Sequence, residues 1–163
     1  MVYSNKFGLK KITEGLGSFS KGKEQNIYSY ENTNIIPLIC YEIIFTELVQ
    51  NITENKNMII NISEDGWFGQ SAGPKQHFVH SLYRAIESGK YILRSANNGI
   101  AAVINPLGMI EKKVDFNESG YIDFNLFKKM KPTVFSRYKN RIFFLLILLY
   151  IFLTFSFNRI KNE

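Results

Sequence analysis

The sequence has a single cysteine, Cys40, and only two histidines, His77 and His80. One cysteine excludes an internal disulfide and leaves the redox compartment open. The two histidines are three residues apart with no third ligand spaced to join them, so we expect no metal site and no cofactor. A lone cysteine is most often a small buried hydrophobic side chain, which is the alternative to any functional role for Cys40.

A signal peptide and a nucleic-acid-binding patch are also missing. Residues 1–9 contain no apolar core of the kind that directs export, so we expect no export signal there. The net charge is +6, but the lysines are scattered and the only crowding of cations precedes an apolar tail. Those cations are Lys128, Lys129, Lys131, Arg137, Lys139 and Arg141. Their placement favours a membrane surface over nucleic acid as the partner.

The apolar tail, residues 142–157, is a run of sixteen residues without charge, flanked by Arg141 and Arg159. We expect it to form a transmembrane helix. Sixteen helical residues span about 24 Å, less than the roughly 30 Å of a hydrocarbon core, so the flanking cations would have to reach back to the interface. A buried core helix is the alternative, but the segment has no polar face.

The rest of the chain alternates strand and helix patterns. The run Ile35–Ile39 is apolar without alternation, which is typical of a strand covered on both faces. Further elements are expected as helix 41–52, strand 57–63, helix 75–90, strand 91–96, strand 100–105 and edge strand 120–126. This order predicts an α/β sheet with packed helices.

The sequence divides into four parts by composition. A polar arm, or partial lid region, covers residues 1–34, with loop or extended structure and at most a short helix. An α/β domain follows at 35–127, then a basic linker at 128–141 and the tail at 142–157. Ligand sites in open α/β folds lie beyond the carboxyl ends of strands, and Cys40 occupies that position after Ile35–Ile39.

Five short motifs occur in order along the α/β part. They are Cys40-Tyr41-Glu42, Asp65-x-Trp67-Phe68-Gly69, Gly73-Pro74 with Gln76-His77, Arg84-Ala85-Ile86-Glu87, and Arg94 followed by Asn97-Asn98-Gly99. Together they resemble the carbon–nitrogen hydrolase (nitrilase) superfamily and, within it, the apolipoprotein N-acyltransferases. The resemblance runs from about Gly17 to the tail. It implies the carboxy-terminal part of a nitrilase-like α/β fold.

The resemblance also implies a chemistry and a set of site residues. Cys40 would be the nucleophile that takes an acyl chain from a phospholipid as a thioester and passes it to the amino-terminal diacylglyceryl-cysteine of an apolipoprotein. Tyr41 and Glu42 would support it, and a solvated carboxylate at a helix start is the alternative for Glu42. The acyl pocket would include Trp67, Phe68, Asn97 and Asn98. Core packing is the alternative for Trp67, and a simple turn is the alternative for Asn97-Asn98-Gly99.

The family's general-base glutamate and oxyanion-stabilising lysine precede the part that this chain matches, and neither is present in it. We therefore expect a truncated enzyme of the inner membrane that is inactive alone and works with a separate amino-terminal half. Two alternatives stay open. The chain could be a fragment of a nitrilase- or amidase-type hydrolase, or a non-catalytic remnant or subunit.

Overall fold

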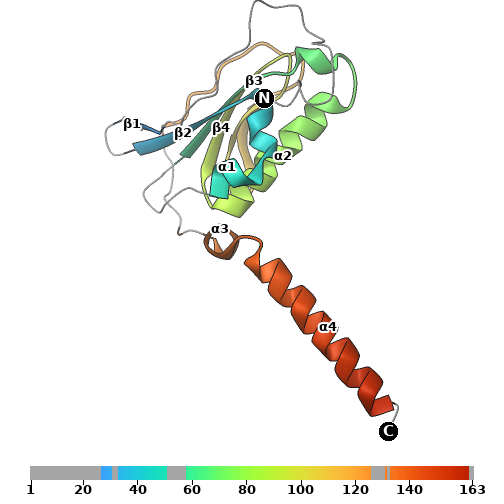
Figure 1. The fold of residues 1–163 in the computed structure, drawn as a ribbon. Coiled ribbons are helices and arrows are strands. Elements are labelled where there is room, and N and C mark those ends of the chain that lie inside the picture. Colours follow the sequence, from blue (N-terminus) through green and yellow to red (C-terminus); the bar gives the residue numbers. More distant parts are fainter. Residues whose placement is uncertain (1–26, 31–32, 51–57, 126–130, 132, 162–163) are drawn as a thin grey trace, which may run out of the picture.

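The structure is a computed structural model that describes residues 27–30, 33–50, 58–125, 131 and 133–161. Six strands form one sheet in sequence order, with α1 and α2 packed on one face (Figure 1). The strands are β1 (Tyr28–Tyr30), β2 (Thr33–Ile39), β3 (Met58–Glu64), β4 (Tyr91–Asn97), β5 (Ala101–Ile104) and β6 (Ile110–Val114). The helices are η1 (Cys40–Ile44), α1 (Thr46–Gln50), η2 (Gly66–Phe68), α2 (Gly73–Ser88), α3 (Val134–Tyr138) and α4 (Arg141–Lys161).

The three central strands run parallel and in register. Ile39 of β2 lies opposite Ile62 of β3, and Glu64 of β3 lies opposite Asn97 of β4. The outer pairs β1–β2, β4–β5 and β5–β6 are antiparallel. Because β2, β3 and β4 point the same way, their carboxyl ends meet at one edge of the sheet, and the segments that follow them come together there.

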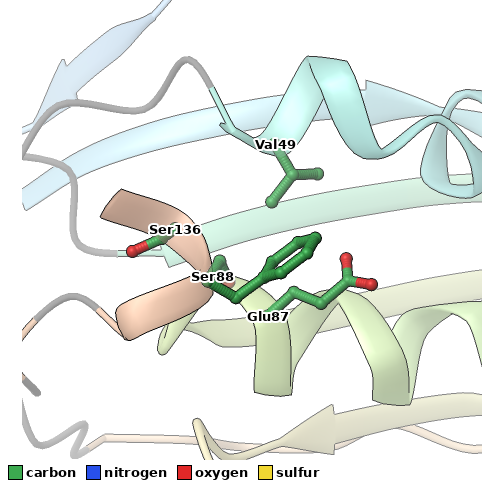
Figure 2. A pocket seen from close by; sticks show the side chains of 5 residues that line it. Val49, Glu87, Ser88 and Ser136 are labelled. Atoms are coloured by element: carbon green, nitrogen blue, oxygen red, sulfur yellow. The ribbon is translucent and has the colours of Figure 1, made fainter. Parts of the chain in front are cut away.

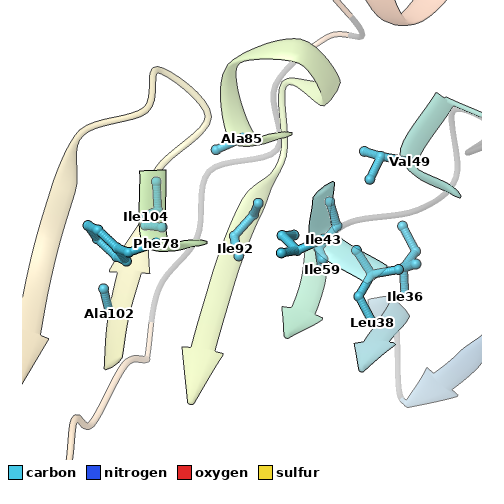
Figure 3. Packing of buried hydrophobic residues seen from close by; sticks show 10 residues of the cluster. All are labelled: Ile36, Leu38, Ile43, Val49, Ile59, Phe78, Ala85, Ile92, Ala102 and Ile104. Carbon is cyan, nitrogen blue, oxygen red and sulfur yellow. The ribbon is translucent and has the colours of Figure 1, made fainter. Parts of the chain in front are cut away.

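The core covers both faces of the central strands, as the unbroken apolar runs predict. On the helical face, side chains of the strands pack against η1, α1 and α2 (Figure 3). The members of this cluster are Ile36, Leu38, Ile43, Val49, Ile59, Phe78, Ala85, Ile92, Ala102 and Ile104. On the opposite face, a second cluster contains Met58, Tyr91 and Val103, with Ile122 and Phe124 packed against it.

Helix α2 begins and ends where its sequence indicates. Pro74 occupies its first turn, where a missing N–H costs nothing, and Gly89 follows its last residue with a left-handed φ of 67°. The Gly89 N–H bonds to the Ala85 carbonyl at 2.9 Å, which closes the final turn. The predicted helix and the predicted strands that flank it are therefore confirmed to within two residues.

Two predicted elements differ from the structure. The helix expected at 41–52 is instead the 3₁₀ turn η1 and the short helix α1, because Phe45 is extended (φ −85°, ψ 107°) and breaks the run between them; residues 51–52 lie outside the described part. The edge strand expected at 120–126 is also wrong. Its described residues, 120–125, form no strand, and β6 pairs with β5 at that edge.

The amino-terminal arm and the basic linker are described in part. Residues 1–26 and 31–32 of the expected polar arm lie outside the described residues, and its described part contains β1 and the start of β2. The linker includes α3, which Thr133 caps by accepting a hydrogen bond from the Ser136 N–H at 3.1 Å. Helix α4 follows and points away from the sheet (Figure 1).

The predicted transmembrane helix at 142–157 is wrong. Among the residues described by the structure, no helix has both the length and the apolar character that crossing a membrane requires. The uncharged run on which the prediction was based has sixteen residues, about 24 Å as a helix, against about 30 Å for a hydrocarbon core. Arg141 and Arg159 flank the run within helix α4.

The core predicts a sharp contrast between two isoleucines of β3. Ile59 is fully buried, whereas Ile62, three residues on, is 59% exposed. Ile59→Ala should lower the free energy of unfolding by about 2–5 kcal/mol, since it removes three buried carbons and leaves a cavity. Ile62→Ala is the matched control and should cost under about 1 kcal/mol. Urea titration followed by circular dichroism measures both, and equal losses would contradict the assigned core.

Candidate functional site

The carboxyl end of β2 presents Cys40 in a constrained backbone conformation. Its φ is +50°, a left-handed value that is uncommon for a residue with a side chain. Two side chains hold the backbone on either side of it. The Glu42 carboxylate accepts the Ile39 N–H at 2.8 Å, and Asn61 Nδ2 donates to the Leu38 and Cys40 carbonyls at 3.1 and 3.3 Å.

The Cys40 thiol is half-buried and makes its polar contacts with β3. Its Sγ lies 3.7 Å from Ser63 Oγ and 3.9 Å from the Glu64 carbonyl oxygen. The Ser63 hydroxyl has one proton and two neighbours that could accept it, since Asp65 Oδ1 lies only 2.7 Å away. The nearer, charged acceptor takes the proton, because hydrogen bonds to carboxylates are roughly twice as strong as neutral ones.

A buried ion pair lies at the centre of the site. Arg94 of β4 donates from Nη2 to Asp65 Oδ2 at 2.7 Å, and neither side chain is exposed to solvent. Asp65 also accepts from Ser63 and contacts Nδ1 of His77, on α2, at 2.8 Å. Arg94 reaches further to Asn61 Oδ1 and to the Ile100 carbonyl. These residues join β3, β4 and α2 through buried polar groups, and we call Asn61, Ser63, Asp65, His77 and Arg94 the polar layer.

The polar layer keeps Asp65 ionised. Burial by itself would raise the pKa of Asp65, but hydrogen bonds from His77 and Ser63 and the charge of Arg94 outweigh burial and lower the pKa from 3.8 to about 2. Burial also lowers the pKa of Arg94, and the neighbouring Asp65 and Cys40 oppose that change. At neutral pH Asp65 and Arg94 therefore form a pair of opposite charges.

His77 is held in place by a hydrogen bond to Asp65 and by contacts with two aromatic rings. Because Asp65 is ionised, the Nδ1 of His77 carries the proton and donates it to Asp65. The imidazole ring packs between Tyr41 and Phe68, with ring centroids 5.3 and 5.7 Å away. Tyr41 and Phe68, both predicted site residues, thus lie beside the polar layer and help to cover it.

The other predicted site residues lie at the rim. Trp67 is 80% exposed, on the loop after β3. Asn97 ends β4 and donates to the Glu64 carboxylate, which also accepts the Gly66 N–H at 2.7 Å. Asn98 has a φ of +51° and begins the turn to β5. The structure therefore brings Cys40, Tyr41, Glu42 and Phe68 to one place and sets Trp67, Asn97 and Asn98 around its edge.

Asn61 and Ser63 were not among the predicted site residues. Their signal is present in the sequence, since they interrupt the apolar run of β3 at every second position and so share the face of Ile59. Gly99 carries a related signal. A Cβ at Gly99 would overlap the Asp65 carboxylate, so the turn after β4 packs its bare backbone against the ion pair.

A recess lies outside this site, between α1, α2 and α3. Val49, Glu87, Ser88, Phe135 and Ser136 line it (Figure 2). Another recess, near the start of α2, is lined by Gln70, Ser71, Pro74, Lys75 and Phe116. Neither contains Cys40 or a residue of the polar layer, so the candidate site rests on the strand ends.

A half-buried cysteine at a strand end, with its backbone held by Asn61 and Glu42 and a hydrogen-bonded layer of polar side chains beneath it, suits nucleophilic catalysis. Comparison with known proteins identifies the family. The sequence profile of the carbon–nitrogen hydrolases matches residues 10–127. The chain belongs to the carbon–nitrogen hydrolase family.

Relatives and a solved structure narrow the comparison. The apolipoprotein N-acyltransferase of Rickettsia bellii is 46% identical over 144 residues, 87% of this chain and 29% of the relative. That of Rickettsia prowazekii is 39% identical over 165 residues, covering 100% of this chain and 33% of the relative. Nit3 of Saccharomyces cerevisiae, a nitrilase-superfamily member, matches 61% of this chain and 40% of its own with 20% identity and a TM-score of 0.53. The yeast match supports the nitrilase-like fold, and both Rickettsia relatives are named apolipoprotein N-acyltransferases.

The ion pair predicts a specific dependence of stability on pH. Because the folded-state pKa of Asp65 is lowered, its contribution is fully present above pH 3.8 and is lost as pH falls toward about 2. Wild type should lose about 2 kcal/mol of unfolding free energy over that window beyond what Asp65→Asn loses. Denaturant titrations of both proteins at several pH values give the difference. Parallel curves would show that Asp65 does not carry this charge.

Proposed function

We propose that this chain carries the nucleophile of an apolipoprotein N-acyltransferase. The main support is the position of Cys40 at the end of β2, with a left-handed backbone held by Asn61 and Glu42. The names of the two Rickettsia relatives support the reaction, and the chain spans 29% and 33% of their lengths. The substrates are therefore a phospholipid acyl donor and the amino terminus of a lipoprotein.

The reaction needs two steps at the Cys40 sulfur. In the first, Sγ attacks the ester carbonyl of a phospholipid, the carbon–oxygen bond breaks, and the lysophospholipid leaves with a proton on its oxygen. In the second, the α-amine of the lipoprotein's diacylglyceryl-cysteine attacks the thioester, the carbon–sulfur bond breaks, and the thiol regains a proton. The acyl chain ends on nitrogen as an amide, and Cys40 is regenerated.

Each step also needs a proton acceptor and a group that stabilises the oxyanion. Within the described residues, the polar contacts of Sγ are with the neutral Ser63 hydroxyl and Glu64 carbonyl. We expect a glutamate base and a lysine from outside these residues, on the same polypeptide or on a separate amino-terminal half. Asp65, the one carboxylate of the polar layer, is not free to act as the base, because it is already bonded to Ser63, His77 and Arg94.

The rim residues fit the lipid substrate. Trp67 offers a large exposed ring beside the site, which suits contact with an acyl chain. Phe68, Asn97 and Asn98 would border the path by which the acyl chain reaches Cys40. Tyr41 and Glu42 would keep the turn η1, which begins with Cys40, in place. Because both substrates carry acyl chains, we expect the enzyme to work at the inner membrane. It would meet the lipid there without any membrane-crossing helix in the described part of the chain.

Acylation of Cys40 tests the proposal directly. A nitrophenyl acyl ester is a suitable donor, since its leaving group departs without a proton donor and so reduces the need for a general base. We expect wild type to gain one acyl group, visible by mass spectrometry, that hydroxylamine removes. Cys40→Ala should gain none, and Cys40→Ser should gain an ester that resists mild hydroxylamine.

The lysine-rich composition requires one control, because lysines can be acylated without catalysis. Such adducts resist hydroxylamine and appear equally in Cys40→Ala, so they are subtracted. Phospholipid vesicles then replace the ester, with the full chain and a coexpressed amino-terminal half. A hydroxylamine-labile adduct that persists in Cys40→Ala, or its absence from wild type with both donors, would overturn the proposal.

A further inference from the structure

Arg94 is the most connected residue beneath the nucleophile, although it does not touch the sulfur. The residue is 3% exposed, and its side chain is fully buried. Each nitrogen of the guanidinium donates to a different partner: Nη1 to Asn61 Oδ1, Nη2 to Asp65 Oδ2, and Nε to the Ile100 carbonyl at 3.3 Å. A planar guanidinium with three engaged nitrogens has one orientation, so the partners of Arg94 are fixed relative to one another.

Arg94 determines which way the Asn61 amide points. The two ends of an asparagine amide look alike, but a guanidinium only donates, so the oxygen of Asn61 must face Arg94. The Asn61 Nδ2 group then faces the opposite way, toward the carbonyls of Leu38 and Cys40 at 3.1 and 3.3 Å. Asn61 is fully buried, so no solvent is available to satisfy a reversed amide.

The backbone that Asn61 holds is the strained one. A left-handed residue with a side chain costs about 1–3 kcal/mol and persists only where its surroundings enforce it. Cys40 has that conformation, and its own carbonyl is one of the two that Asn61 binds. Two contacts therefore lead from Arg94 through Asn61 to the peptide unit that carries the nucleophile.

We propose that Arg94 is a positioning residue for Cys40 and acts through Asn61. The proposal rests on the proposed function, because it assigns the positioned thiol to acyl transfer. Arg94 aligns the Asn61 amide, Asn61 holds the Cys40 carbonyl, and the left-handed turn presents Sγ to the acyl donor. Loss of this alignment slows acylation without weakening the binding of the donor.

The test combines Arg94→Lys, Asn61→Leu and the double variant. Lysine keeps the charge beside Asp65 but has one ammonium in place of a fork, so it cannot serve Asp65, Asn61 and Ile100 together. The measured quantities are the maximal acylation rate of Cys40 with the nitrophenyl ester and the ester concentration at half-maximal rate. Each single variant should lose tenfold or more in maximal rate with the half-saturating concentration unchanged. The double variant should be no slower than the slower single, since both act along one chain of contacts.

Arg84→Met is the matched control. Arg84 is also buried, at 6% exposed, but it contacts Thr46 and Glu87 and neither Asn61 nor Cys40. The Arg84→Met variant should be less stable than wild type, but its maximal acylation rate at Cys40 should be unchanged. If the double variant fails to fold, Asn61→Asp replaces it. Aspartate keeps an oxygen that can accept from Arg94 but has no N–H to donate to the Cys40 carbonyl. The Asn61→Asp variant should therefore acylate Cys40 as slowly as the other variants.

A conformational measurement separates failure of this proposal from failure of the proposed function. The only cysteine, labelled with ¹³C, gives one Cα resonance whose chemical shift reports its backbone conformation. Arg94→Lys should move that resonance, and Arg84→Met should leave it in place. If wild type forms no acyl adduct, the proposed function fails and this resonance alone decides the positioning role. An unmoved resonance, a wild-type acylation rate in Arg94→Lys, or additive losses in the double variant would overturn the proposal.

Discussion

The buried ion pair between Arg94 and Asp65 is the constraint on which the site depends. Both side chains are withdrawn from solvent, and withdrawing two charges costs several kcal/mol per ion unless their hydrogen bonds are satisfied. The fold satisfies them with Ser63 and His77 around Asp65, and with Asn61 and the Ile100 carbonyl around Arg94. Removing either charge would leave the other buried and unpaired, so the layer forms as a whole.

This constraint explains why the sheet is polar at one edge and apolar below it. On the helical face, Ile59 and Ile92 fill the core, and the next inward positions, Asn61 and Arg94, belong to the polar layer. The side chains on this face change from apolar to polar near the end of β2, which Cys40 follows. A rigid hydrogen-bonded layer under a strained residue can hold a nucleophile in place before substrate arrives, which is the arrangement that enzymes use to reduce the entropic cost of reaction.

The sequence predicted the central strands, helix α2 and the position of Cys40, because long apolar runs, Pro74 and Gly89 are local signals. It did not predict the split of 41–52 into η1 and α1, since the break at Phe45 follows from the left-handed Cys40 and the 3₁₀ turn after it. Asn61 and Ser63 were missed because their partners, Arg94 and Asp65, are distant in sequence or on a neighbouring loop. The membrane-spanning prediction at 142–157 was wrong: it was based on the hydrophobicity of a sixteen-residue run, and no helix in the described part of the chain combines the length and the apolar character that a span requires.

The coupling between Asp65 and Arg94 tests the central claim most directly. A double-mutant cycle with Asp65→Asn, Arg94→Met and the combined variant, followed by the free energy of unfolding at pH 7, isolates their interaction from the cost of each change. If the ion pair organises the strand ends, the coupling should be about 2 kcal/mol or more, and the double variant should be more stable than the two single losses together imply. A coupling below about 0.5 kcal/mol would show that the two charges act independently and would contradict the account.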